Sequence, residues 1–377
     1  MDTFSASRYT TNMSIHSSLP PVHERSDSLE SEAWTIWNQK VKPQLSLGML
    51  ERIAVDIVMM TGQLHPQLGR PQMLVFAADH GIVAEGVSSS PQEITWQQCE
   101  NFARGHGAIG LLCDRNGIDL HIIDVGVCYT FPEESAVIPK KVAWGTQNFL
   151  YQSAMTEAQL QQALLAGREM VQVLVAQGHR VFAFGEMGIG NTTSSSALMV
   201  CRTSLDVQQC TGRGAGLDDT ALVHKQQVIT EALKRGGIPN DPIEALRQYG
   251  GFEIAALVGA MIEAAHQRCV LLIDGFITTV AAEIAQSVRP ACQQYMLFCH
   301  ESSESGHALL LQHMEAKALL SLRMHLGEGS GAAVAWSLIH NAVQLYNDME
   351  SFAEAEVTDS VSLLQRQGID ARTWEHI

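Results

Sequence analysis

The residues best suited to bind a ligand or to catalyse a reaction lie at 184–196, which read FGEMGIGNTTSSS. An apolar, β-prone run precedes them at 180–184, and a small-then-apolar run that suits a packed helix follows at 194–200. A strand that turns through glycines into a helix N-terminus presents free N–H groups, so Gly188, Gly190, Asn191 and Thr192 could bind phosphate. Glu186 does not suit that role, because a carboxylate repels phosphate, and it suggests a proton acceptor or a group that attracts a cation. From the glycines alone, a plain turn between strand and helix is an equally good interpretation.

A second glycine-rich stretch, TGRGAGLDD at 211–219, precedes a helical run that contains Lys225. The alternate glycines Gly212 and Gly214, together with Arg213 and Lys225, could hold a phosphate. A flexible loop between helices explains the same pattern equally well. Ser302 follows the last clear strand, where small hydroxyls suit hydrogen bonds to phosphate or ribose, although a helix cap is as plausible.

A third stretch, LGEGSG at 326–331, places Glu328 between two glycines just before an apolar helical run. A carboxylate in such a frame can be shielded from water and still reach a ligand. Burial would raise its pKa and suit a general base. A lone Glu in this position is otherwise more often a charge at a helix N-terminus.

A fourth stretch, SSSPQEIT at 88–95, contains Pro91 and Gln92. Serine followed by Pro, with Glu93 three residues after Ser90, is the pattern of a capping box. The residues alone therefore favour a helix cap at this point.

The elements that must position these residues are strands alternating with helices. Apolar runs predict strands at 73–78, 119–127, 180–184, 268–275 and 295–300, and a long amphipathic pattern at 156–178 predicts a helix. This alternation indicates an α/β fold with a parallel sheet covered by helices on both faces. We expect a mobile tail at 1–27, an α/β catalytic domain at 71–331, and a small helical lobe from 28–70 and 332–377.

Composition narrows the class of partner. The 377 residues carry a formal charge of −16, which argues against nucleic acid or an anionic membrane as the main partner. The eight cysteines include no C-x-x-C pair, so neither a zinc site nor a disulfide framework is expected. No signal peptide or membrane span is evident, which predicts a cytoplasmic protein.

Seven short motifs together resemble nicotinate-nucleotide–dimethylbenzimidazole phosphoribosyltransferases, which act in assembly of the lower ligand of cobalamin. The resemblance covers about residues 30–355 and is specific because the motifs occur in the family's order. They are ADHG at 78–81, SPQEIT at 90–95, GEMGIGNTT at 185–193, GRGAGLDD at 212–219, GGFEI at 250–254, LIDGFI at 272–277 and LGEGSG at 326–331. Two departures are Ala78 and His325, where the family usually has Gly and Arg.

The resemblance implies transfer of the phosphoribosyl group of nicotinate mononucleotide to 5,6-dimethylbenzimidazole or a related base. It implies Glu328 as general base and Glu186 as its support, with no cofactor, no metal and a homodimer. It further implies a base pocket and a nucleotide site. The base pocket would comprise Pro91, Gln92, Met187 and Leu326, and the nucleotide site Gly188, Gly214, Lys225 and Ser302, to which the glycine turns add Gly190, Asn191, Thr192, Gly212 and Arg213.

Two other function classes remain possible from the residues. The strand, glycine turn and helix at 181–196 would suit a NAD-dependent oxidoreductase. The glycine order G-x-x-G-x-G and the lack of an acidic strand end about twenty residues later argue against it. A non-catalytic nucleotide- or base-binding protein is the other class, and Glu186 and Glu328 argue against it.

Overall fold

The structure, a computed structural model, describes residues 15–359. Its centre is one six-stranded parallel sheet with the strand order β3-β2-β1-β4-β5-β6. β1 and β4 are buried at every position, as continuous apolar strands covered on both faces should be. The predicted parallel sheet is confirmed, and the short edge strand β3 was not anticipated. The strands are β1 (Gln72–Ala78), β2 (Asp119–Gly126), β3 (Ile138–Pro139), β4 (Val181–Met187), β5 (Val270–Ile273) and β6 (Met296–Phe298).

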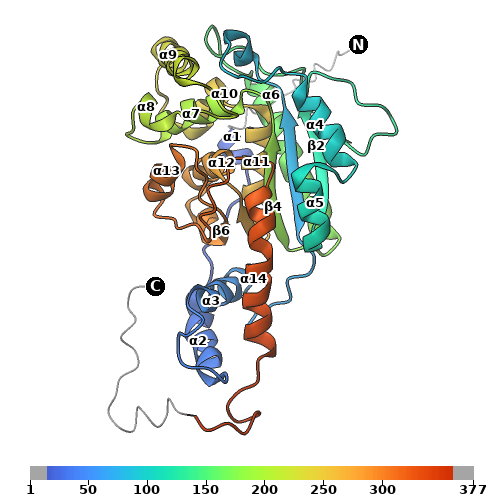
Figure 1. Ribbon diagram of the computed structural model, residues 1–377, viewed down its shortest axis with the longest axis vertical. Coiled ribbons are helices and arrows are strands. Elements are labelled where there is room, and N and C mark those ends of the chain that lie inside the picture. Colours follow the sequence, from blue (N-terminus) through green and yellow to red (C-terminus); the bar gives the residue numbers. More distant parts are fainter. Residues whose placement is uncertain (1–14, 360–377) are drawn as a thin grey trace, which may run out of the picture.

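Helices cover both faces of the sheet and make three layers (Figure 1). One face carries α6 (Glu157–Ala176), α11 (Phe252–His266) and α12 (Phe276–Val288), and the other carries α4 (Ile94–Ala103), α5 (Gly107–Asn116) and the start of α14 (Ser330–Asp348). α11 lies between the sheet and α6, so every residue from 252 to 265 is buried and the helix needs no polar face. The helices between β4 and α11 are α7 (Asn191–Arg202), α8 (Val207–Cys210), α9 (Asp219–Gly236) and α10 (Pro242–Tyr249).

The order of the strands predicts a ligand-binding crevice at the carboxyl ends of the strands. The chain leaves β1 toward β2 in one direction and leaves β4 toward β5 and β6 in the other. Ligands of open α/β sheets bind where the direction reverses, outside the carboxyl ends of the strands. The turns after β1, β4, β5 and β6 all lie at that end of the sheet, so a ligand site is expected there.

The observed start of α6 agrees with the sequence prediction, whereas the observed start of α4 does not. Thr156 caps α6 with Gln159 in a capping box, as the long amphipathic pattern suggests. The predicted cap at Ser90 is wrong, because α4 begins only at Ile94 and Glu93 precedes it without a side-chain cap. Pro91 and Gln92 therefore lie in an irregular segment before the helix.

A second hydrophobic cluster lies below the sheet, where α2 (Glu30–Gln39) and α3 (Met49–Thr61) meet the end of α14 (Figure 1). Trp37 and Tyr346 form its centre, with ring centroids 5.3 Å apart in an edge-on arrangement. α14 belongs to both parts, because its first turns pack on β4 and α5 and its last turns pack on α3. Residues 360–377 of the predicted lobe lie outside the described residues.

The second half of the predicted tail, residues 15–27, is packed against the catalytic body. Ile15 and Leu19 are buried in the main core. Arg289 donates hydrogen bonds of 2.7–2.9 Å to the carbonyls of His16, Leu19 and Pro20. Residues 1–14 lie outside the described residues.

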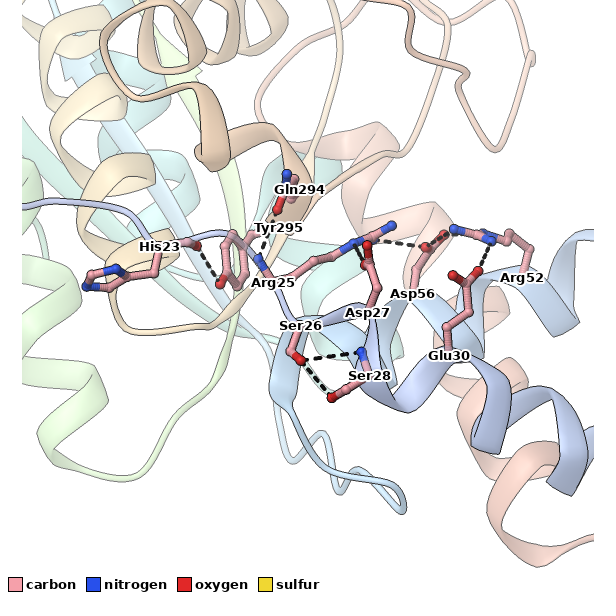
Figure 2. Close-up of polar contacts among 10 residues, drawn as sticks. All are labelled: His23, Arg25, Ser26, Asp27, Ser28, Glu30, Arg52, Asp56, Gln294 and Tyr295. Atoms are coloured by element: carbon pink, nitrogen blue, oxygen red, sulfur yellow. Dashed lines mark hydrogen bonds and ion pairs between the residues drawn. The ribbon is translucent and has the colours of Figure 1, made fainter.

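Figure 2 shows how this segment continues toward the small lobe. The Tyr295 hydroxyl donates to the carbonyl of His23 at 3.0 Å, and Gln294 accepts the N–H of Arg25 at 2.9 Å. Arg25 then pairs with Asp56 on α3 at 3.0 Å. This segment is held in place despite its polar composition, because side chains far away in the sequence satisfy its backbone groups.

Candidate active site

The crevice at the carboxyl ends of β4, β5 and β6 holds a cavity of about 240 Å³. Four carboxylates contribute to its wall, one from β4, one after β5, one after β6 and one before α14. A cluster of this kind favours a cationic group on the ligand or on the reaction path. The four are Glu186, Asp274, Glu304 and Glu328.

Glu328 sits in an unusual backbone conformation. Gly327, Glu328 and Gly329 have φ values of +77°, +64° and +87°, so three successive residues are left-handed. A side chain in this region costs roughly 1–2 kcal/mol, and such strain is retained mainly at functional positions. Glu328 is 8% exposed, and its Oε2 has no hydrogen-bond partner within residues 15–359.

Asp274 fixes this loop from the end of β5. Its carboxylate accepts the N–H groups of Gly329 at 3.1 Å and Ala332 at 3.2 Å, and also that of Gly331. These are the free donors at the start of α14, so Asp274 acts as the helix's N-terminal cap from another element. Sequence reasoning assigned Asp274 no role, although its place after an apolar strand was the available signal.

The pKa values of these two carboxyl groups are raised. Burial raises the pKa of Glu328 to about 7, and the nearby Asp274 adds to the effect. Burial also raises the pKa of Asp274 to about 7, although its three backbone hydrogen bonds oppose the shift. A carboxyl group that titrates near neutrality is suited to accept a proton.

Glu186 links the glycine turn to the Glu328 loop. Its Oε2 accepts a short hydrogen bond from the Asn191 amide, and its Oε1 accepts the N–H of Glu328 at 3.4 Å. Burial raises the pKa of Glu186 well above its ordinary value, and Asp274 and Glu253 add to the shift. The structure thus brings together the two glutamates that the sequence proposed for chemistry.

A buried polar pair supports the glycine turn from below. His80 Nε2 lies 2.7 Å from Glu253 Oε1, and His80 Nδ1 lies 2.9 Å from Ser194 Oγ at the start of α7. A Cβ on Gly188 or Gly190 would lie within 3.4 Å of the His80 side chain, so the turn packs closely on it. His80 and Glu253 do not line the cavity, so their contacts position the turn. Sequence reasoning gave neither a role, although both fall within its motifs.

The neighbouring end of the crevice contains a fully buried lysine. Lys225 Nζ donates to Thr192 Oγ1 at 2.8 Å and to the carbonyl of Gly212 at 3.3 Å. Burial lowers the pKa of Lys225 to about 8, and the Glu304 carboxylate acts in the opposite direction. A smaller cavity of about 60 Å³ adjoins Lys225 and the glycine turns, which is a suitable place for an anion.

Most of the predicted site residues meet at these two cavities. The main cavity is lined by nine of them: Glu186, Met187, Gly188, Asn191, Thr192, Gly214, Ser302, Leu326 and Glu328. The smaller cavity adds Gly190, Arg213 and Lys225, and Gly212 contacts Lys225 from outside its wall. Arg213 is half exposed and paired with Asp219.

The predicted base-binding residues Pro91 and Gln92 do not form part of the main cavity wall. Their neighbours Ser90, Ile94 and Gln98 do. The Gln92 side chain instead lies near the carboxylate of Asp79, just after β1, where it partly offsets the burial that raises the pKa of that carboxyl group. A contact from Gln92 to a base would compete with this interaction.

Comparison with known proteins agrees with this geometry. A family model described as phosphoribosyltransferase matches residues 22–357. The nicotinate-nucleotide–dimethylbenzimidazole phosphoribosyltransferase of Dechloromonas aromatica is 48% identical over 325 residues, covering 85% of this chain and 93% of that protein. The chain belongs to this phosphoribosyltransferase family.

Other members of the phosphoribosyltransferase family support the assignment. The nicotinate-nucleotide–dimethylbenzimidazole phosphoribosyltransferase of Bacteroides fragilis is 42% identical over 321 residues, covering 85% of this chain and 93% of that protein. The crystal structure of CobT from Thermus thermophilus has a TM-score of 0.84 and 36% identity, covering 88% of this chain and 99% of that one. The α/β fold is therefore that of the phosphoribosyltransferase family.

One residue that departs from the family pattern lines the site. His325 forms part of the cavity wall, and its Nδ1 lies 3.1 Å from Ser303 Oγ.

Within residues 15–359, no group of three or more His, Cys, Asp or Glu side chains is arranged to hold a metal ion. In the same part of this phosphoribosyltransferase, no helix is both long and apolar enough to cross a membrane.

Proposed function

We propose that this phosphoribosyltransferase transfers the 5-phosphoribosyl group of nicotinate mononucleotide to 5,6-dimethylbenzimidazole, giving α-ribazole 5′-phosphate and nicotinate. The observation that carries the proposal is a strained, buried Glu328 that faces the same crevice as the buried Lys225. The first would serve the base and the second the nucleotide phosphate. The names of the curated relatives support this pair of substrates.

The chemistry requires one proton acceptor. Nicotinate leaves from a pyridinium, so its nitrogen becomes neutral as the bond to C1′ breaks and no general acid is needed. The incoming benzimidazole attacks C1′ through one nitrogen and loses the proton on the other. Glu328 accepts that proton, and attack opposite the leaving group converts a β-nucleotide into an α-product.

The other carboxylates have supporting roles in this proposal. Asp274 holds the Glu328 loop through three backbone N–H groups, so the base is aimed before the substrate arrives. Glu186 is fixed by Asn191 and stabilises positive charge that develops on the ribose. Met187 and Leu326 supply apolar surface for the base, and Ser302 also lines the cavity.

The test of Gln92 concerns the base alone. Gln92→Ala should raise the KM for the base more than the KM for the nucleotide, because the amide would be a base contact. Steady-state kinetics with each substrate varied in turn would measure this difference. Gln97→Ala, an exposed glutamine on α4, is the matched control. Unchanged base kinetics in Gln92→Ala would mean that Gln92 does not contact the base.

The function itself is tested by incubating the protein with nicotinate mononucleotide and a panel of benzimidazoles and purines. Mass spectrometry should identify a ribazole 5′-phosphate and free nicotinate. No product with any base, in the presence of measurable nucleotide binding, would favour a binding protein instead. We also propose a cytoplasmic homodimer, and light scattering would measure the number of subunits.

A further inference from the structure

Glu304 is an unexpected group at the nucleotide end of the site. It lies on the loop between β6 and α13 (His307–His313), and its half-buried side chain reaches back to the second glycine-rich stretch. Its Oε1 accepts the N–H of Gly214 at 3.2 Å. A Cβ on Gly212 would collide with the Glu304 carboxylate, so the glycine is what allows this approach. The Glu304 carboxylate thus accepts a hydrogen bond from a backbone N–H of the kind that binds phosphate.

Lys225 explains why an anion is present there. A buried ammonium group needs a negative partner, because desolvation is otherwise expensive. The two hydrogen-bond acceptors of Lys225 that we identify, Thr192 Oγ1 and the carbonyl of Gly212, are both uncharged. Glu304 is the carboxylate whose field favours the charged form of Lys225.

A bound phosphate would compete with this arrangement. The 5′-phosphate proposed for this site would use the same Gly214 N–H and the same Lys225 charge. A carboxylate beside a phosphate is a like-charge contact, which is strongly unfavourable. One of the two anions must therefore leave, and Glu304 is held to Gly214 by a single hydrogen bond from a half-exposed loop.

We propose that Glu304 is a resident counterion of the empty site, which holds the Gly214 N–H and balances Lys225 until a nucleotide phosphate displaces it. This inference rests on the proposed function, because the displacing group is the 5′-phosphate of its substrate. Displacement makes phosphate binding weaker than the lysine and glycines alone would make it. Substrate and product carry the same phosphate, so weaker binding of both also helps the product to leave.

The experiment removes the charge and measures binding of inorganic phosphate and of nicotinate mononucleotide by calorimetry. Glu304→Gln should bind both ligands at least about tenfold more tightly than the wild type, because the competing charge is gone. Glu301→Gln is the matched control, since Glu301 lies on the same loop but not in the cavity wall, and it should leave both affinities unchanged. Lys225→Met should weaken phosphate binding in the wild type and in the Glu304→Gln background.

Unchanged or weaker binding of phosphate by Glu304→Gln would overturn the inference, and the carboxylate would then be a ligand contact or a structural group. If phosphate binding depends on Lys225 but not on Glu304, the inference fails and the nucleotide site stands. If neither ligand binds to any variant, the inference and the proposed function both fail. Should Glu304→Gln not fold, Glu304→Asp draws the charge away from Gly214 and should tighten phosphate binding by a smaller factor.

Discussion

Replacing Glu328 by Gln should lower kcat by about 10²–10⁴-fold, the usual contribution of a positioned general base. Gln keeps the size of the side chain and its place in the left-handed loop but cannot accept the proton from the benzimidazole. Nucleotide binding should be largely kept, because the loss falls on the transition state. Single-turnover kinetics at saturating substrate would measure the effect.

The pH profile provides a second measure of the same group. Burial raises the pKa of Glu328 to about 7, so the base is protonated and inactive below that pH. The kcat/KM of the wild type should therefore rise as the pH increases through about 7, and Glu328→Gln should lose this dependence. Glu315→Gln is a suitable control, because Glu315 also has a positive φ, of 52°, and lies outside the cavity wall.

A kcat of Glu328→Gln within about twofold of the wild type, against the general-base range above, would move the role to Glu186 or to solvent. The double substitution with Glu186→Gln would separate these two cases. Activity lost only in the double variant would identify Glu186 as the substitute base. Activity retained in it would leave solvent as the proton acceptor.

The second large effect should appear when the nucleotide loses its 5′-phosphate. Nicotinic acid riboside should bind far more weakly than nicotinate mononucleotide, because Lys225 and the glycine N–H groups lose their partner. Each charge-assisted hydrogen bond contributes roughly 1.5–3 kcal/mol, or about 10- to 150-fold in affinity. Calorimetry with both ligands measures the difference.

Lys225→Met tests whether that difference comes from the buried lysine. The variant should weaken binding of the mononucleotide and leave binding of the riboside nearly unchanged. The Lys225→Met substitution and the removal of the phosphate from the ligand together form a double-mutant cycle. Equal affinity of the wild type for riboside and mononucleotide would rule out the phosphate assignment. Weakening of both ligands by the same factor would make Lys225 a structural residue.

The sequence predicted five of the six strands, because apolar runs mark β1, β2, β4, β5 and β6, whereas β3 is only two residues long. It also brought out Glu328, because the glycines on either side mark a backbone that turns sharply, and Glu186, because a carboxylate beside a glycine turn does not suit phosphate. Contacts between residues far apart in the sequence could not be predicted in this way. Nothing local shows that Arg289 binds the carbonyls of residues 16–20, and the tail was therefore expected to be mobile.

The same limit applies inside the site. Asp274 needs α14 beside it before its carboxylate can cap that helix, and Glu304 needs Gly212 and Lys225, which lie far away along the chain. Ser90 and Pro91 fit a capping pattern, yet α4 begins only at Ile94. The motif residues thus meet at the two cavities, whereas the partners of each carboxylate followed only from the fold.

α14 has a mechanical consequence for catalysis. The helix begins at Ser330, directly after the Glu328 loop, and 19 residues later it ends beside the Trp37–Tyr346 contact, about 28 Å away. One continuous helix thus joins the small lobe to the Glu328 loop, so a shift of α14 in the lobe would also move the loop. Catalytic geometry tolerates errors of less than about 1 Å. The contacts of α14 with α3 in the small lobe therefore help to hold the Glu328 loop in position.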